Sequence, residues 1–111
     1  MALQYLILSS GSGTVIQLTD ICFIKASENG VLIQLQDGRQ HKEWKSLKQI
    51  ALTLSDQPDF LQVHRSYIVN KKFLKVVRAN NLHLTGSHII PIGITLKEQV
   101  HQLISKNNMK L

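Results

Sequence analysis

Cysteine is nearly absent from this chain of 111 residues: Cys22 is its single example, so no disulfide can form within it. Cys22 stands in an apolar stretch, which predicts a small buried side chain rather than a reactive thiol. No apolar run approaches the roughly 18 residues that a membrane-spanning helix needs. The first residues have neither the basic flank nor the small-residue cleavage site of a signal peptide. We therefore expect a cytoplasmic protein with no membrane partner.

Aromatic and acidic side chains are also few. The three Phe, two Tyr and one Trp are too sparse to predict a surface on which single-stranded bases stack. Seven acids face thirteen Lys and Arg, which gives a net charge of +6. Such an excess favours a polyanionic partner, although it does not distinguish DNA from RNA, an acidic membrane or an acidic protein.

The patterns of known catalytic and metal sites are missing. There is no nucleophile elbow, no Ser-His-Asp order and no pair of carboxylates in an apolar setting, so we expect no enzyme and no small-molecule substrate. The Gly-rich segment 9–13 has no Lys-Ser/Thr ending and predicts a hairpin turn rather than a phosphate loop. The histidines are scattered and have no cysteine partner: His41, His64, His83, His88 and His101. We therefore expect neither a metal nor a cofactor.

Short apolar–polar alternations separated by turn residues predict a mainly β protein with two short α-helices, folded as a single domain over residues 1–111. Asn29-Gly30 and Asp37-Gly38 are hairpin signals, and Pro91 places its strand at a sheet edge. The polar strand 39–43 is also expected at an edge. The strands are expected at 3–8, 14–18, 20–24, 31–36, 39–43, on both sides of 64–66, in the second half of 70–78, at 82–85 and at 88–92, and the helices at 46–54 and 95–105.

Both helices are predicted to begin with a capping box, formed by Ser46 with Gln49 and by Thr95 with Glu98. The buried stripes at helical spacing are Leu47, Ile50, Ala51 and Leu54 in the first helix and Leu96, Val100, Leu103 and Ile104 in the second.

The segment just before the first helix carries one aromatic ring and two cations. Trp44 is expected in a half-buried position. Lys45 and Lys48 stand where the helix dipole disfavours cations. An anion beside them would explain this, but solvated lysines are the favoured interpretation.

The most informative run is 60–70, which contains two extended pieces. Leu61 and Val63 alternate with polar residues, and Tyr67 and Val69 alternate with Ile68 and Asn70, as expected of strands with one buried face. Between the pieces stand His64, Arg65 and Ser66, a set of donors with nothing apolar among them. Donors mounted on a stiff turn suit phosphate oxygens and the acceptor edge of guanine. A solvated turn is the alternative interpretation.

This run, together with the hairpin 82–92, the last helix and the early strand 20–27, resembles the LytTR-type DNA-binding domain, a family of mostly bacterial transcription regulators. The resemblance implies an elongated stack of small, mostly antiparallel β-sheets with short helices at the side. It also implies sequence-specific binding to double-stranded DNA at paired direct repeats, with a second copy on the DNA. We expect no phospho-acceptor receiver domain within these 111 residues, which either stand alone or form part of a longer regulator.

The resemblance further implies that three loops, matching 27–30, 64–66 and 93–95, enter successive major grooves. Arg65 is the strongest candidate, because its fork can grip guanine or a phosphate bidentately. In the third loop Gly93 and Ile94 replace the usual serine and basic residue. Asn70 is expected to cap the following turn. The predicted DNA-binding residues are Asn29, His64, Arg65, Ser66 and Thr95 in the loops, and Lys71, Lys72, Lys75 and Arg78 as backbone contacts.

An alternative function is a protein-interaction module on the same scaffold with weakened DNA binding. It rests on the replacements at 93–94 and on the acidic Glu28 in the first loop. An exposed apolar patch around Ile90, Ile92 and Ile94 would favour it.

Overall fold

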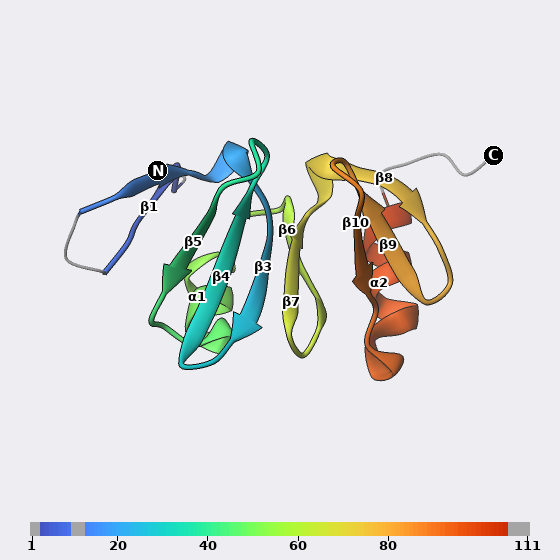
Figure 1. The fold of residues 1–111 in the computed structure, drawn as a ribbon. Coiled ribbons are helices and arrows are strands. Elements are labelled where there is room, and N and C mark those ends of the chain that lie inside the picture. Colours follow the sequence, from blue (N-terminus) through green and yellow to red (C-terminus); the bar gives the residue numbers. More distant parts are fainter. Residues whose placement is uncertain (1–2, 10–12, 107–111) are drawn as a thin grey trace.

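A computed structural model describes residues 3–9 and 13–106 as an elongated stack of three antiparallel β-sheets (Figure 1). The molecule measures 46 × 29 × 25 Å. Its sheets have two, five and three strands, and their orders are β1-β2, β5-β4-β3-β7-β6 and β10-β9-β8. This confirms the predicted fold class. No helix in the described ranges has the length and apolar content needed to cross a bilayer.

The elements follow one another along the chain as β1 (Tyr5–Ile7), β2 (Val15–Gln17), η1 (Leu18–Asp20), β3 (Ile21–Ser27), β4 (Gly30–Leu35), β5 (Gln40–Glu43), α1 (Leu47–Thr53), β6 (Phe60–His64), β7 (Tyr67–Asn70), η2 (Lys71–Phe73), β8 (Leu74–Val77), β9 (Asn81–Leu84), β10 (His88–Pro91), η3 (Ile94–Leu96) and α2 (Lys97–Ser105). The predicted strands are present with shifted ends, and β5 and β10 are edge strands as expected. The predicted turn at 9–13 lies partly outside the described residues.

The turns that build the central sheet follow from its Asn and Gly residues. Asn29 adopts a left-handed conformation with φ of 60°, and Gly38 has φ of 93°. At Gly30 the reason is a close approach: a Cβ there would lie 2.1 Å from the Glu43 carbonyl oxygen. The β3–β4 turn and the end of β5 are therefore packed together.

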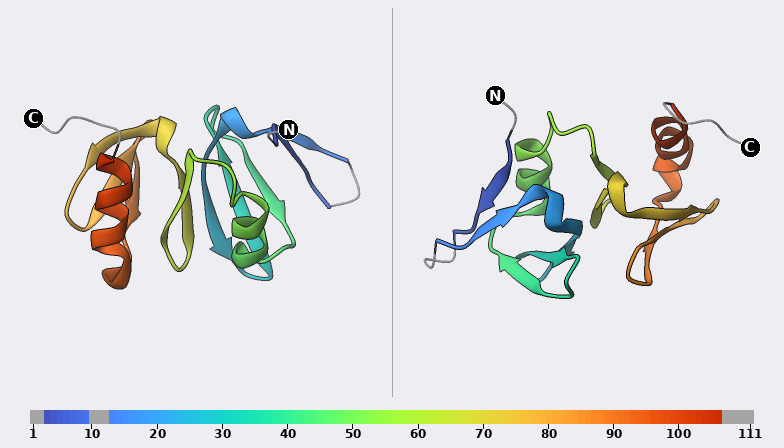
Figure 2. Two further views of the ribbon diagram at one scale, coloured as in Figure 1. Left: turned by 180° about the vertical axis from the view of Figure 1, so that it is seen from behind. Right: turned by 90° about the horizontal axis from the view of Figure 1, so that it is seen from above.

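The central sheet is covered on both faces. Ile24, Ile33 and Ile68 pack on one face with α1 and the β1–β2 hairpin. Val63 and Val69 pack on the other side with the three-stranded sheet and α2. The two helices lie on the same side of the molecule (Figure 2). Since consecutive residues of β7 enter different cores, the single buried face predicted for this strand was wrong.

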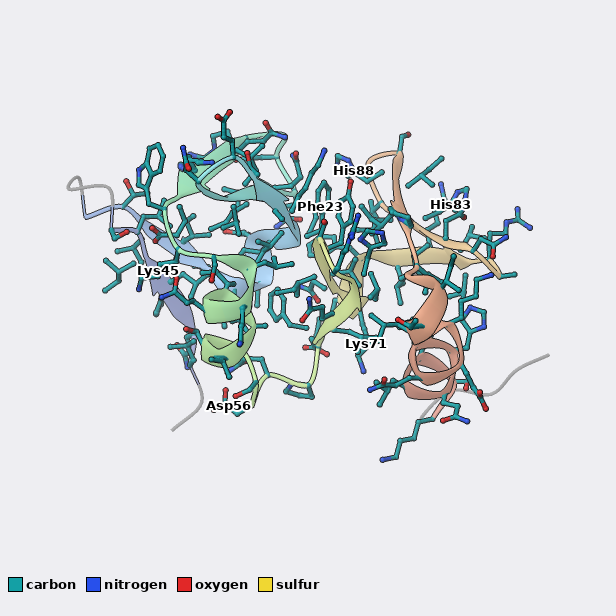
Figure 3. All side chains as sticks on the ribbon, turned by 90° about the horizontal axis from the view of Figure 1, so that it is seen from below. Phe23, Lys45, Asp56, Lys71, His83 and His88 are labelled. Atoms are coloured by element: carbon teal, nitrogen blue, oxygen red, sulfur yellow. The ribbon has the colours of Figure 1, made fainter. Side chains whose placement is uncertain are left out.

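The two packed halves also meet through aromatic rings. Phe23 of β3 and His88 of β10 stack edge to face with their ring centroids 5.0 Å apart (Figure 3). The Tyr67 ring lies 6.3 Å from the Phe23 ring. Cys22, beside Phe23, is buried as predicted, and burial raises the pKa of its thiol.

The two helices begin differently. The capping box of Ser46 and Gln49 is present at α1. At α2 the capping box expected of Thr95 and Glu98 was wrong, because η3 precedes the helix and its N-cap is Leu96. The Leu96 N–H donates to the Gly93 carbonyl oxygen at 2.9 Å. Thr95 therefore lies inside the 3-10 turn and does not cap α2.

Two side chains expected in or near the core are more exposed. Trp44 is 60% exposed, and its ring lies 5.2 Å from the Lys42 ammonium. Glu43 points inward instead, because its carboxylate accepts hydrogen bonds from the backbone N–H and hydroxyl of Ser9 and from the Trp44 N–H. Leu103 is 38% exposed and does not complete the buried stripe of α2.

Candidate nucleic-acid interface

Three loops from distant parts of the chain lie side by side along one long edge of the molecule, at the bottom of Figure 1. We call residues 27–30, 64–66 and 93–95 the loop row. The Ala26 N–H donates to the Ser66 carbonyl oxygen at 2.8 Å, which ties the first loop to the second. The Gly93 N–H donates to the Val63 carbonyl oxygen at 2.8 Å, which ties the third loop to the second. These two hydrogen bonds thus connect the three loops of the row to one another.

The central loop is a tight turn between β6 and β7. The Ser66 N–H donates to Nδ1 of His64 at 3.0 Å, so the proton of the neutral ring is on Nε2. The His64 ring also packs edge to face on Tyr67, with 5.6 Å between centroids. Arg65 is exposed at the tip. Within the described residues the one ion pair found joins Arg39 and Asp37, so Arg65 is not engaged by a carboxylate.

The first loop presents Glu28 and Asn29, both exposed. Lys42 of β5 donates to the Glu28 carbonyl oxygen, so a cation lies beside this loop. Lys25 of β3 pairs with Tyr67 across the sheet, and its ammonium lies 5.9 Å from the Tyr67 ring. Lys25 therefore stands between the first and second loops.

The third loop is apolar at its tip. Ile94 is 86% exposed, whereas Ile90 and Ile92 are 2% and 5% exposed. The patch that would have favoured a protein-interaction module therefore does not form, because two of its three members are in the core. Thr95 is exposed, and Lys97 follows it as the first residue of α2.

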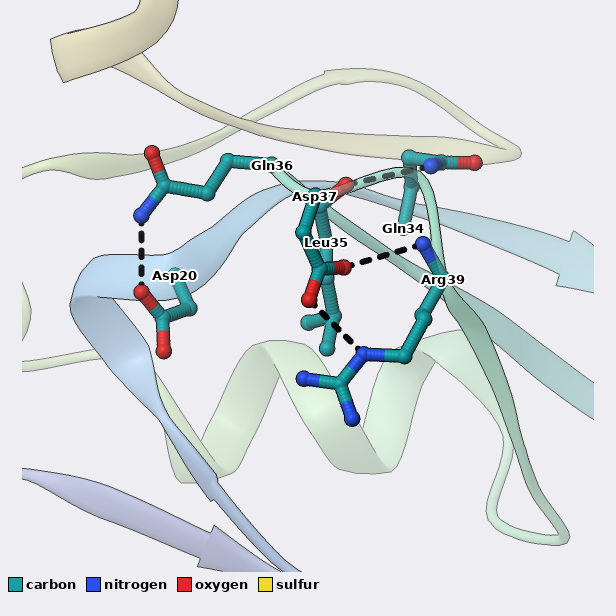
Figure 4. Close-up of polar contacts among 6 residues, drawn as sticks. All are labelled: Asp20, Gln34, Leu35, Gln36, Asp37 and Arg39. Carbon is teal, nitrogen blue, oxygen red and sulfur yellow. Dashed lines mark hydrogen bonds and ion pairs between the residues drawn. The ribbon is translucent and has the colours of Figure 1, made fainter.

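Acidic side chains are unevenly placed around the loop row. The four aspartates lie away from the loop row: Asp20 precedes β3, Asp37 is in the β4–β5 turn, and Asp56 and Asp59 are in the connection from α1 to β6. Gln36 donates to Asp20, and Arg39 donates to Asp37 at 2.7 Å (Figure 4). The Arg39 N–H, together with its guanidinium, lowers the pKa of Asp37.

The carboxylates near the loop row are three glutamates. Glu43 is 3% exposed and fully engaged by hydrogen bonds, so it offers no charged surface to a ligand. Glu28 and Glu98 remain exposed there. The cations near the row outnumber them and come from five different segments: Lys25, Lys42, Lys45, Arg65 and Lys97.

The predicted backbone-contact cations are not on this edge. β7 runs away from the loop row, and η2 with Lys71 and Lys72 follows at its far end (Figure 1). The Lys71 N–H donates to the Asp59 carbonyl oxygen at 2.7 Å, which places this turn beside an aspartate. Lys75 and Arg78 lie on and just after β8, in the three-stranded sheet. The expectation that the tip and these four cations share one surface was therefore wrong.

Asn70 has the structural role that was expected of it. It is 2% exposed, accepts from the Lys72 N–H at 3.0 Å and donates to the Ile21 carbonyl oxygen at 2.9 Å. In contrast, Lys25, Lys42 and Lys97 were missed as candidate ligand contacts. Each of these lysines is an isolated cation in the sequence. Each lies near the loop row only because of strand pairing or a hydrogen bond of a neighbouring loop.

The fold is a stack of small antiparallel sheets in which three turns gather along one edge (Figure 1). The family model of the LytTr DNA-binding domain matches residues 12–108. The chain therefore belongs to the LytTR family of DNA-binding domains, a family of transcription regulation rather than of enzymes.

Among solved structures, a LytTr DNA-binding domain from Bacillus cereus superposes with a TM-score of 0.73 at 15% identity. The alignment covers 93% of this chain and 97% of that one. At this identity the likeness concerns the fold. No curated protein matches the chain.

Proposed function

We propose that this chain binds double-stranded DNA sequence-specifically through the loop row and acts in transcription regulation. The observation that carries the proposal is the joining of three distant loops into one cation-bearing edge, with the four aspartates elsewhere. Phosphates are attracted to such an edge. The loop row follows the long axis of the molecule (Figure 1), so its three loops can follow the direction of a duplex.

Each loop has a separate part in this proposal. Arg65 grips guanine with its fork, and Asn29 can pair with adenine. The Nε2–H of His64 is a donor for a base edge or a phosphate, and Ser66 holds the turn through its backbone. Thr95 donates from the third loop. The surrounding cations, Lys25, Lys42, Lys45 and Lys97, neutralise phosphates.

The rest of the proposal concerns the setting of this site. The chain acts as one domain over residues 1–111, in the cytoplasm, on paired direct repeats with a second copy at the second repeat. No catalysis, metal or cofactor is required. Lys71, Lys72, Lys75 and Arg78 are left out of the main contact surface because β7 leads away from the loop row.

The decisive experiment is selection of duplexes from a random pool at physiological salt, followed by titration of the winner at several salt concentrations. We expect one enriched sequence and a log–log salt slope of roughly −4 to −5, which corresponds to about four to six neutralised phosphates. Enrichment of no sequence, or a flat slope, would refute the proposal. A scrambled duplex of equal length is the control for non-specific attraction.

A further inference from the structure

Trp44 is the single tryptophan of the chain, and its side chain is 60% exposed just after β5. Its position is nevertheless fixed. The Trp44 N–H donates to the Glu43 carboxylate at 2.8 Å, and a Cβ on Gly30 would lie 3.0 Å from the Trp44 Cα. On one side the ring meets the Lys42 ammonium, which is 5.2 Å from the ring centroid. A large ring with an N–H donor that is held in place at the surface is suited to contact a ligand, because little freedom is lost on binding.

Strand pairing continues this feature across the central sheet. Lys42 of β5 lies opposite Leu32 of β4, and Leu32 lies opposite Lys25 of β3. Lys25 in turn lies opposite Tyr67 of β7, and its ammonium is 5.9 Å from the Tyr67 ring. Residues directly opposite each other point to the same face, and the usual strand spacing places the backbones of Lys42 and Lys25 about 10 Å apart. We call Trp44, Lys42, Leu32, Lys25 and Tyr67 the cation–ring band, in which ammonium groups alternate with apolar side chains.

The cation–ring band is connected to the first two loops of the loop row. Lys42 donates to the Glu28 carbonyl oxygen of the first loop. Tyr67 packs edge to face on His64 of the second loop, with the ring centroids 5.6 Å apart. The connection from β5 to α1, which holds Trp44, lies beside the β3–β4 turn in Figure 1. Since the backbones of the two strands border each groove of a duplex, loops that enter a groove bring one backbone next to the band.

The charges around the cation–ring band favour an anionic ligand. Lys25 and Lys42 belong to the band, and the exposed Lys45 lies at its end. Glu43 is 3% exposed and engaged by hydrogen bonds, so Glu28 is the exposed carboxylate beside these three cations. A purely apolar partner would remove water from the ammonium groups without pairing them. A DNA backbone instead alternates phosphates with the apolar faces of deoxyriboses, which matches the alternation in the band.

We propose that the cation–ring band binds the sugar–phosphate backbone of one DNA strand, beside the groove that the first two loops enter. Trp44 packs on a deoxyribose and donates its indole N–H to a phosphate oxygen, while Lys42 and Lys25 bind the neighbouring phosphates. This inference rests on the proposed function and adds to it a contact outside the loop row. Because the backbone carries no base edges, the band raises the affinity for every duplex and does not select a sequence.

The test uses Trp44 itself, because the tryptophan fluorescence of the chain reports on this position alone. In a titration with the selected duplex, we expect the emission to change in step with the anisotropy of the labelled DNA. Trp44→Ala should weaken binding to the selected and the scrambled duplex by the same factor, about fivefold, and should leave the salt slope unchanged. Lys42→Ala should instead make the salt slope less steep by about one, because it removes a phosphate contact.

Tyr5→Ala is the matched control, since it removes another exposed ring, in a hollow lined by Lys72 at the far end of β7. It should bind both duplexes as the parent does, and circular dichroism should show that all variants remain folded. Trp44→Phe keeps an aromatic ring but loses the N–H, so it should recover part of the affinity that Trp44→Ala loses.

Uncharged methylphosphonates, placed one at a time in the selected duplex, locate the contact. One or two positions beside the base pair read by the first loop should weaken binding of the parent, and the same positions should have much less effect on Lys42→Ala. Emission that stays constant while the duplex binds would overturn the inference and leave the proposed function standing. So would a Trp44→Ala variant that binds like Tyr5→Ala. If no duplex binds, the proposed function fails and the inference fails with it.

Discussion

The Nδ1 atom of His64 accepts a hydrogen bond from the backbone N–H of Ser66 at 3.0 Å, so the ring closes the turn that presents Arg65. We expect His64→Ala to lower the free energy of unfolding by about 1 kcal/mol, because both this bond and the contact with Tyr67 are lost. DNA affinity should fall with it. Urea denaturation beside duplex titration measures both. An unchanged stability would mean that the turn forms without the ring.

Arg65→Ala should leave stability unchanged and weaken binding to the selected duplex by about 1–3 kcal/mol, because it removes a bidentate contact without a folding partner. Lys72→Ala is the matched control: it removes one exposed cation at the far end of β7. Four residues of strand span roughly 13 Å, beyond the screening length of about 8 Å at physiological salt. Fluorescence anisotropy compares the two. Equal losses would contradict the assignment of the interface to the loop row.

Ile94 has no donor, yet it is 86% exposed in the third loop. We expect it to contact the methyl group of a thymine in the selected site, a contact of about 1 kcal/mol. Replacing that thymine by uracil removes only the methyl, and Ile94→Ala removes only its partner. In a double-mutant cycle the combined loss should be smaller than the sum of the single losses. Strictly additive losses would show that the two groups do not touch.

Burial alone would raise the pKa of Glu43, but the hydrogen bonds from Ser9 and Trp44 and the nearby Lys45 charge outweigh it and lower the pKa below its ordinary 4.5. Because folding lowers the pKa of this carboxyl group, its charged form stabilises the folded state. The stabilisation is present above the pKa of the unfolded state and is lost as the pH falls through the pKa of the folded state. Thermal unfolding between pH 6 and about 3 should therefore show a drop that Glu43→Gln makes shallower. The variant itself should be less stable at neutral pH. A parallel pH dependence in both proteins would assign the drop to other carboxylates.

Asn70→Ala should lower the free energy of unfolding by about 2–3 kcal/mol, since it leaves a buried Ile21 carbonyl oxygen and the Lys72 N–H without their partner. Asn80→Ala, at an exposed position, should change stability by less than about 0.5 kcal/mol. Denaturant titration of both variants gives the comparison. A small loss at Asn70 would indicate that water replaces its amide.

Much of the fold was predictable because its signals are local. Asn29 and Gly38 adopt positive φ where the hairpin signals predicted turns, and Ser46 with Gln49 caps α1. The predictions that were wrong concern features that depend on tertiary packing. Periodicity could not reveal that β7 separates two cores, since both faces of its strand are apolar. Nor could it reveal that Glu43 rather than Trp44 turns inward, because Ser9, the partner that makes this favourable, is 34 residues away.

The candidate site was predictable in the same limited way. The tip at 64–66 is a local motif, and its consecutive polar donors can be recognised in the sequence. Lys71 and Lys72 follow it closely in sequence, but an extended strand carries the chain to the opposite edge within four residues. Lys25 and Lys42 show the converse, because antiparallel pairing brings together residues that sequence keeps apart.

The loop row has five cations nearby against two exposed glutamates, so the potential beside this edge is positive. A polyanion is attracted to this edge before any atoms touch, and the attraction is strongest when the row faces it. A larger fraction of collisions then arrives correctly oriented, and the gain fades as added salt shortens the range of the field.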